Sequence, residues 1–544
     1  MELKVLGESQ SKSIYYNCKE RFYDIDWLKI VAVWLVILVH VIQYLRILNI
    51  NISETQIIIS TRMIVFFLQF GMPIFFYSSG RVSFKSKKFN FYTFFKKKVL
   101  RLLVPLAIGY FTILPLTHYI SFGRRPCVNY IDVLNCSYFE YYIEYIKDFS
   151  CHGFEWLWFL ALLAITNILF YPFAVILANT NANLNVKNND VGILTFIFCL
   201  LISICFGPII AFCYDLNPIF AIGLSLPYII TVMSSFVIRY SLIRKKELLY
   251  LTAISFILST LVISFYGNLG NSSQRNIKNN LSNALRGTFS QITTYNKGIN
   301  ISFRRGILVN LDGRKMFLAI IYYIAFFAVG YIDGTIRYIN SNECSQIFYY
   351  QIESERDKEK VNNRQDHNYQ LLSYAKTQLK LSPVHSDLSI GIIASIPGSF
   401  RPFIIFISVA LGILSLSLKF KNIGYMWSYP LYEDSQSAML YVTGSWIFVF
   451  GLSLISEIYM NSEFNPILYK HFITSSIIFY IVHMFWLEAC LSYLIIPYNI
   501  TFDYSIFIVF ISVIGLCSLS YFLMTRISGL CTLFGVSISL SDDK

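Results

Sequence analysis

Charged residues are scarce in this sequence. Asp, Glu, Lys and Arg make up 14% of the 544 residues, whereas hydrophobic residues make up 56%, and the mean hydropathy is +0.55. Soluble domains carry roughly a quarter charged residues, so soluble cores could not bury this much apolar surface. The composition excludes an ordinary soluble protein and predicts that lipid is the main solvent.

Signatures of several cofactor-dependent classes are also absent. The sequence has no Walker loop, no glycine fingerprint for dinucleotides and no recognisable spacing of metal ligands. These absences argue against an ATP-driven pump, and we expect no metal. The net charge is +13, but Lys and Arg are spread between apolar segments and do not form one basic domain. We therefore expect no nucleic-acid partner.

What the sequence does contain is a series of long apolar segments. A helix needs about 20 apolar residues to cross roughly 30 Å of hydrocarbon. We predict an all-α fold, a polytopic transmembrane helical bundle of about 10–12 spanning helices in a lipid bilayer. The first span is interpreted as retained, because it is too long for the apolar core of a signal peptide. The predicted spans cover residues 27–48, 57–80, 99–120, 154–178, 191–213, 216–238, 248–267, 316–333, 402–420, 437–460, 472–497 and 504–525.

Basic residues between the spans predict the orientation of the chain. Lys and Arg gather in the loops at 85–98 and 239–246, and short basic loops usually face the cytosol. N-glycosylation sequons fall in loops assigned to the opposite side, at Asn51, Asn135, Asn271, Asn280, Asn300 and Asn499. We predict a multi-pass glycoprotein of an endomembrane (endoplasmic reticulum or Golgi) or of the plasma membrane, with both termini in the cytosol.

The same alternation of sides predicts the organisation of the chain into regions. We expect a cytosolic N-terminal segment (1–26), a first transmembrane part (27–334) with a luminal loop (269–314), a polar cytosolic linker (335–400), a second transmembrane part (401–526) and a cytosolic tail (527–544).

Two histidines lie inside predicted spans, where ionisable groups are costly and often functional. His40 lies eleven residues after Lys29, which is about 16 Å along a helix, and His483 lies at a similar predicted depth in span 472–497. A neutral imidazole can accept a hydroxyl proton near neutral pH, so both are candidate catalytic bases. The alternative for each is a core imidazole that hydrogen-bonds a backbone carbonyl.

Further polar residues accompany these histidines. Lys29, Lys98 and Arg101 lie at the predicted cytosolic boundary, where their charges would suit phosphate groups, although ordinary interfacial anchoring is the alternative. Asp26 lies one turn before Lys29, and Glu488 lies in the same predicted span as His483. Either carboxylate could instead pair with another helix.

Four segments, in this order, resemble the acyltransferase 3 family. In that family a basic residue, ten intervening residues and a histidine form a signature in the first span. The matching segments here are Lys29 to His40, Met72-Pro-Ile-Phe-Phe through Lys98-Val-Leu-Arg101-Leu-Leu-Val-Pro105, Trp156-Leu-Trp158-Phe-Leu, and Tyr480-Ile-Val-His483. The chain looks most like the bacterial glucan-modifying members. Lys29 stands where arginine is more usual, which keeps the charge but loses bidentate geometry.

The resemblance implies an O-acyltransferase. Such an enzyme moves an acetyl, succinyl or similar group from cytosolic acyl-CoA to a hydroxyl of a carbohydrate or glycolipid acceptor. Lys29, Lys98 and Arg101 would then hold the coenzyme phosphates, and His40 would act as general base or carry the acyl group transiently. His483, Asp26 and Glu488 would support it as further catalytic residues.

Two other functions fit the same residues. A secondary transporter also uses intramembrane His and Glu, although the paired halves that transporters often have are not visible here. A catalytically silent relative could retain these side chains as well.

Overall fold

The computed structural model describes twelve stretches of the chain. They are residues 22–48, 52–83, 91–121, 137–147, 155–179, 218–240, 245–269, 321–337, 398–417, 435–460, 465–498 and 500–527, with isolated positions in 197–208 and at 533–534. The luminal loop predicted at 269–314, the linker predicted at 335–400, most of the predicted span 191–213 and both predicted cytosolic ends lie largely or wholly outside the described residues.

Within these residues every regular element is a helix, as predicted. The long helices are α2 (Tyr23–Leu48), α3 (Glu54–Ser83), α9 (Trp158–Asn179), α11 (Pro218–Tyr240), α12 (Lys245–Leu269), α17 (Arg401–Ser417), α18 (Ser435–Tyr459), α19 (Pro466–Cys490) and α21 (Phe502–Thr525). A further helix covers residues 321–337. The shorter elements are α8 (Tyr138–Lys147), η5 (Glu155–Leu157), η7 (Gly398–Phe400), η9 (Leu491–Ile495) and α20 (Ile496–Tyr498).

Seven of the described helices are long and apolar enough to cross a membrane. They are Tyr23–Arg46, Glu54–Ser83, Tyr92–Ile120, Glu155–Leu177, Ala438–Tyr459, His471–Tyr498 and Phe502–Thr525. Three shorter apolar helices, Ser225–Val237, Glu247–Val262 and Arg401–Leu414, fall on three more of the predicted spans. The protein is therefore a polytopic helical bundle, and the sequence-based fold class is confirmed.

Three prolines explain the positions of three π-helical turns. The run from residue 91 to 120 consists of α4 (Phe91–Lys98), η2 (Val99–Leu103), α5 (Val104–Ile108), η3 (Gly109–Ile113) and α6 (Leu114–Ile120), in which η2 and η3 are π-helical turns. Proline lacks an N–H group and clashes with the carbonyl four residues earlier. For Pro105, Pro115 and Pro497 that earlier residue is the middle of η2, η3 and the π-turn η9, respectively. The widened turns therefore relieve the proline clash.

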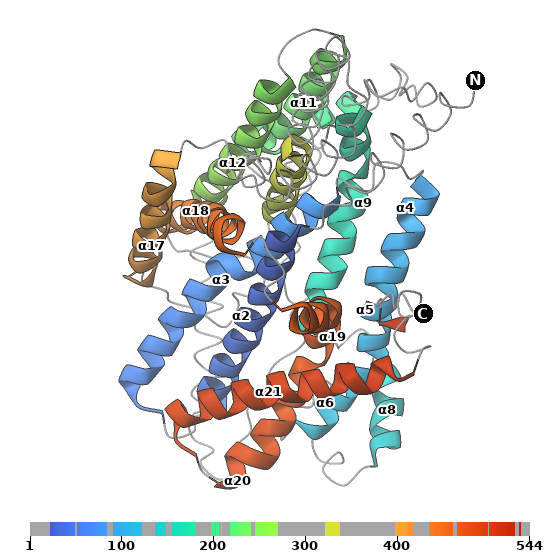
Figure 1. The fold of residues 1–544 in the computed structure, drawn as a ribbon, viewed down its shortest axis with the longest axis vertical. Coiled ribbons are helices and arrows are strands. Elements are labelled where there is room, and N and C mark those ends of the chain that lie inside the picture. The colour runs from blue at the N-terminus through green and yellow to red at the C-terminus, as the bar shows by residue number, and fades with distance from the viewer. Residues whose placement is uncertain are drawn as a thin grey trace, which may run out of the picture.

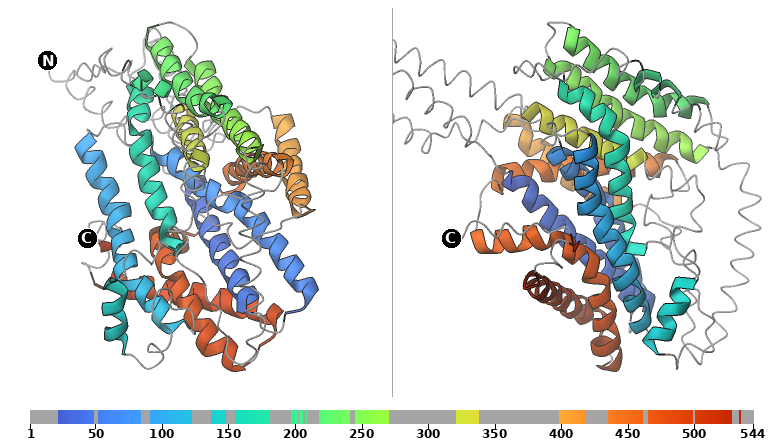
Figure 2. Two further views of the ribbon diagram at one scale, coloured as in Figure 1. Left: turned by 180° about the vertical axis from the view of Figure 1, so that it is seen from behind. Right: turned by 90° about the vertical axis from the view of Figure 1, so that its right-hand side faces the viewer.

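Helix α2 lies in the interior of the bundle. It packs against α3, α18, α19 and α21, and Figure 1 shows it surrounded by these helices. α21 crosses the lower part of the bundle at a steep angle to α4 and α9, which both views of Figure 2 support. This position buries most of α2, including Ala32, Ile37 and Val41, and leaves its polar side chains facing protein.

Helix 321–337 is buried on every side, and it meets α3 at two glycines. A Cβ atom at Gly80 would collide with the carbonyl oxygen of Phe327, and one at Gly330 would collide with that of Tyr77. Small residues allow helices in a membrane to approach this closely. The contact places the last turns of α3 directly beside residues 327–331, in the middle of helix 321–337.

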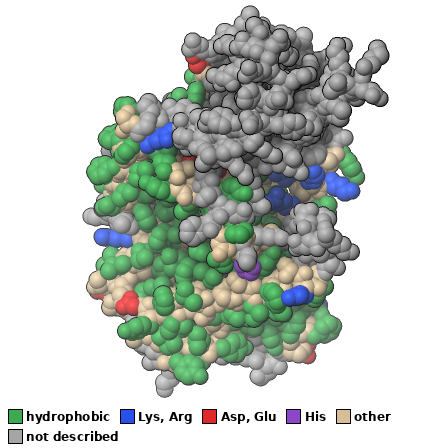
Figure 3. Space-filling view, viewed as in Figure 1, with side chains coloured by type: hydrophobic (Ala, Val, Ile, Leu, Met, Phe, Trp, Pro, Cys, Tyr) green, Lys and Arg blue, Asp and Glu red, His purple; other side chains and the backbone are tan. Residues whose placement is uncertain are grey.

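The surface of the bundle is largely apolar. In Figure 3 hydrophobic side chains cover most of the described face, and charged side chains lie mainly near its margins. Phe406 on α17 and Phe507 on α21 are 69% and 70% exposed. A soluble protein rarely exposes so much apolar surface, so these faces fit contact with lipid.

Candidate active site

His40 and His483, the two histidines predicted at one depth, lie side by side in the structure. His40 belongs to α2 and His483 to α19, and the centroids of their rings are 5.2 Å apart with the ring planes inclined by 37°. Both side chains are buried, with exposures of 6% and 0%. The packing of α19 against α2 thus brings the two imidazoles into one site.

The hydrogen bonds of His483 indicate which of its nitrogens carries the proton. Its Nδ1 lies 2.7 Å from the carbonyl oxygen of Tyr480 and 3.1 Å from that of Phe479. Because a carbonyl oxygen can only accept, Nδ1–H is the donor. In the neutral ring Nε2 then has the lone pair, and this buried atom makes no hydrogen bond to the described part of the chain. Half of the imidazole is satisfied by backbone, and the other half offers an acceptor beside His40.

The motif that begins at Trp156 lies directly against this region. The indole Nε1 of Trp156 donates to the carbonyl oxygen of Ile481 at 3.1 Å, and the hydroxyl of Tyr480 donates to the carbonyl oxygen of Trp156. The ring of Tyr480 is 5.8 Å from that of His483. Two segments that are separate motifs in the sequence therefore form one wall of the site.

Lys29, on α2, lies close to Lys98 and Arg101 of the run at 91–120. Eleven residues correspond to about three helical turns, so Lys29 and His40 project from α2 in nearly the same direction, about 16 Å apart along its axis. Lys98 is close enough to Arg101 and Lys29 to experience both positive charges, and its Nζ donates to the Ser83 hydroxyl at 3.3 Å. Three residues from two segments thus form one concentration of positive charge.

The two weaker candidates lie elsewhere. Asp26 accepts a 2.8 Å hydrogen bond from the hydroxyl of Tyr469 and is 14 residues, about 21 Å, from His40 along α2. Glu488 is buried on α19, but five residues turn it about 140° from His483 around the helix. The structure brings neither carboxylate to the histidine pair.

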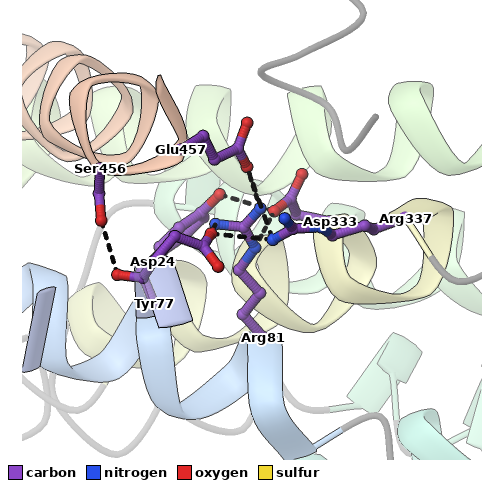
Figure 4. Close-up of polar contacts among 7 residues, drawn as sticks. All are labelled: Asp24, Tyr77, Arg81, Asp333, Arg337, Ser456 and Glu457. Atoms are coloured by element: carbon purple, nitrogen blue, oxygen red, sulfur yellow. Dashed lines mark hydrogen bonds and ion pairs between the residues drawn. The ribbon is translucent and has the colours of Figure 1, made fainter. Parts of the chain in front are cut away.

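A buried network of charges lies at the end of the bundle where α2 begins (Figure 4). The guanidinium of Arg81, on α3, pairs with Asp24 of α2 at 3.1 Å, with Asp333 at 2.7 Å and with Glu457 of α18. Arg337 pairs with Asp24 at 2.8 Å. Arg81, Asp24 and Asp333 have no exposed side-chain surface. Four helix ends are therefore joined by paired charged side chains.

Neutral groups complete this network. The hydroxyl of Tyr77 donates to Asp333 at 2.9 Å, and that of Ser456 donates to the carbonyl oxygen of Asp24 at 2.6 Å. Two guanidinium groups thus face three carboxylates within a shell of hydroxyl donors. Buried charges persist only with such partners, because an isolated ion is costly to remove from water.

Most of this network is not predicted from the sequence. Arg81 and Asp24 each lie within one turn of a predicted span boundary, where charged side chains ordinarily reach water or lipid headgroups. A signal was nevertheless present, because Arg81, Asp333 and Glu457 each lie at the same predicted end of their spans. Opposite charges at one depth on several helices are the pattern that predicts such a network.

Comparisons with known proteins identify the family of this chain. A scan against protein-family models matches residues 22–330 to the acyltransferase domain of the acyltransferase 3 family. The match includes His40, Lys29, Lys98 and Arg101, whereas His483 lies beyond it. Searches of curated proteins and of solved structures gave no match. Since the family match covers more than half of the chain, the protein belongs to the acyltransferase 3 family and is a membrane O-acyltransferase.

Proposed function

We propose that the protein transfers an acetyl, succinyl or similar group from cytosolic acyl-CoA to a hydroxyl of a carbohydrate or glycolipid acceptor. One observation carries the proposal: His40 and His483 face each other at 5.2 Å, and a cluster of three cations lies about 16 Å away along α2. A donor with a charged head and a reactive end at the far tip of a flexible arm suits this arrangement.

The cation cluster supports the donor end of the proposal. CoA carries several phosphate groups, and these groups bind the forked guanidinium of Arg and the point charge of Lys. With the phosphates on Lys29, Lys98 and Arg101, the pantetheine arm would extend along α2 toward His40. The length of that arm is comparable to the rise from Lys29 to His40.

The histidine pair supports the chemistry. His40 takes the proton of the acceptor hydroxyl while the hydroxyl oxygen attacks the thioester carbonyl carbon. The carbon–sulfur bond then breaks, and the CoA thiolate leaves and takes the proton from the His40 imidazolium. The unprotonated Nε2 of His483 would accept a hydrogen bond from a neighbouring hydroxyl of the acceptor and so hold the reacting hydroxyl beside His40 during this step. A second route passes through an acyl group on His40, which the hydroxyl then attacks.

The basic loops and the sequons support an orientation for this reaction. With the cations on the cytosolic side, the donor enters from the cytosol and the acceptor from the lumen or cell exterior. Asp26, near the cations, would belong to the donor entrance. Glu488 would contribute through the packing of α19. We place the protein in an endomembrane or the plasma membrane, with residues 1–26, the linker 335–400 and the tail 527–544 in the cytosol.

The test uses the purified full-length protein and radiolabelled acetyl-CoA. The wild type should release CoA, and His40→Ala and His40→Gln should reduce this release by about 10²–10⁴-fold, the usual range for general acid–base catalysis. His471→Asn is the matched control, because His471 is a half-buried histidine of α19 that packs on Tyr521 outside the site. Normal CoA release by well-folded His40 variants would refute the assignment. A transporter or a silent relative would release no CoA in the wild type.

A further inference from the structure

The turn that precedes α9 has an unusual backbone. Glu155, the first residue of η5, has φ of 39°, and it is the only residue other than glycine with positive φ in the described part of the chain. Positive φ is unfavourable for a residue with a Cβ atom. Such conformations persist only where the surroundings impose them, and they concentrate at functional sites.

The surroundings of this turn hold it against the histidine site. Trp156 is anchored at both ends, its indole on Ile481 and its carbonyl on the Tyr480 hydroxyl. Leu157 packs over Gly109, where an added Cβ would come within 3.2 Å of it. Because Tyr480 and Ile481 lie within one helical turn of His483, these anchors also fix Glu155 close to the histidine pair.

A third buried histidine contacts the strained residue. His118 of α6 places its Nε2 2.8 Å from the Oε1 atom of Glu155. The histidine side chain is only 6% exposed, whereas that of Glu155 is 23% exposed. The imidazole therefore fixes one carboxylate oxygen from within the protein, while the carboxylate itself remains partly accessible.

This pair lies on the far side of the histidine site from the cations. Arg101 and His118 belong to one run of helical turns and are 17 residues, about 25 Å, apart along it. Along α2, His40 is only about 16 Å from Lys29. A ligand that meets Glu155 would therefore approach the histidines from the side opposite the donor phosphates.

We propose that Glu155 is an acceptor-binding residue and that His118 is its positioning residue. The Glu155 carboxylate accepts a hydrogen bond from a hydroxyl that neighbours the reacting one on a polyol acceptor, and so presents the reacting hydroxyl to His40. This inference rests on the proposed acyl transfer to a hydroxyl acceptor. An ion pair that only joined α6 to η5 would not require its carboxylate on a strained backbone.

The test compares transfer to water with transfer to an added hydroxyl. Full-length protein is given acetyl-CoA, and CoA release is measured without acceptor and with increasing methyl glucoside or glycerol. Glu155→Gln and His118→Asn should lose at least tenfold of the polyol-dependent release and raise the KM for the polyol. The KM for acetyl-CoA and the polyol-independent release should stay within twofold of the wild type.

A second variant separates binding from folding. Glu155→Gly removes the carboxylate but adopts a φ of 39° without strain, which offsets part of the lost contact with His118, so the variant should remain folded while polyol-dependent release is lost. His471→Asn should behave as wild type. Retention of polyol-dependent release in the Gln and Gly variants would overturn the inference, as would an equal fall of both kinds of release. A wild type that releases CoA at one rate with and without polyols would also overturn it, whereas a wild type that releases no CoA would refute the proposed function itself.

Discussion

Lys29, Lys98 and Arg101 carry like charges within one small region, and like charges repel more strongly where water is partly excluded. The charges that act on Lys98 are those of Arg101 and Lys29, and its Nζ donates to a neutral hydroxyl, that of Ser83. Binding of a polyanion would relieve this repulsion. The geometry of the three side chains is therefore better suited to holding phosphates than to holding the fold together.

The cation cluster predicts a specific loss of donor affinity. Arg101→Gln and Lys98→Met should each raise the KM for acetyl-CoA about tenfold or more while kcat changes little, because they remove binding that is common to ground state and transition state. Acetyl-pantetheine, which lacks the nucleotide phosphates, is the matched substrate, and its KM should be the same for the variants and the wild type. Steady-state kinetics with both donors make the comparison. An equal loss with acetyl-pantetheine would mean that the cations do not bind phosphate.

At this scale, part of the site could be predicted from the sequence. His40 and His483 are conspicuous because imidazoles in apolar spans are rare, and a fixed helical rise gives their depth. Their adjacency could not be predicted, because it depends on α19 packing against α2 across more than 400 residues of sequence. The pairing of His118 with Glu155 was equally hidden, since each lies at a predicted span boundary.

At the scale of helices, the charge network around Arg81 fixes the ends of α2, α3, α18 and helix 321–337. Arg81→Met should destabilise the protein by about 3–5 kcal/mol, because it leaves Asp24, Asp333 and Glu457 buried with one guanidinium between them. Arg46→Met is the control on the opposite part of α2, where Arg46 donates to the neutral Thr61 hydroxyl at 2.6 Å. It should cost about 1 kcal/mol.

Thermal unfolding in detergent micelles measures both variants. The midpoint of Arg81→Met should fall clearly further than that of Arg46→Met. Equal midpoints would show that the network contributes nothing beyond an ordinary hydrogen bond. Since apolar replacement of a whole buried network can be neutral, the single substitution is the informative one.

The contact between α3 and helix 321–337 makes a second prediction about helices. Gly330→Ala should lower the unfolding midpoint, because its Cβ would collide with the Tyr77 carbonyl and force apart the two helices that carry Arg81 and Asp333. Gly71→Ala, in the middle of α3, has no neighbour within 4 Å of the new Cβ. It should leave the midpoint unchanged or raise it, since alanine favours a helix over glycine by up to about 1 kcal/mol. A similar effect of both substitutions would contradict the close approach.

The helical run at residues 91–120 contains a feature that the hydrophobic pattern does not predict. The apolar pattern predicts one span at 99–120, and one continuous run of turns is present there. The pattern does not predict the widened turns before Pro105 and Pro115, although proline chemistry explains them once they are seen. Each widened turn rotates the helix beyond it, so hydrophobic periodicity could not assign the direction of His118.

At the scale of the whole molecule, the alternation of spans was the most informative feature of the sequence. It assigns the start of the first span and the ends of the spans at 57–80, 316–333 and 437–460 to one side, and the structure brings these four ends together around Arg81. It assigns the starts of the second and last spans to the other side. There Gln56, at the start of α3, donates to Asp503, at the start of α21, at 2.9 Å. The side of the bundle on which each of these helix ends lies could thus be predicted, whereas the tilt of α21 depends on packing.

These two groups of helix ends make the sidedness of the molecule testable. Gln56 and Arg81 are 25 residues apart on α3, about 37 Å, so the groups lie on opposite sides of a bilayer. The sequons at Asn51, Asn135 and Asn499 directly precede α3, α8 and α21, and the basic loop at 85–98 lies beyond Arg81. If the Gln56 side faces the lumen, endoglycosidase treatment of protein from a eukaryotic host should increase its gel mobility. Asn51→Gln and Asn499→Gln should each remove part of that shift.

The basic loop tests the other side of the same bilayer. A cysteine placed at Lys87 should be labelled by a membrane-impermeant maleimide only after the cytosolic side is opened. The donor phosphates are assigned to Lys98 and Arg101, next to that loop, and acyl-CoA is assigned to the cytosol. Labelling of intact cells at Lys87 would therefore put the donor site on the side without acyl-CoA, and it would refute both the orientation and the proposed direction of transfer.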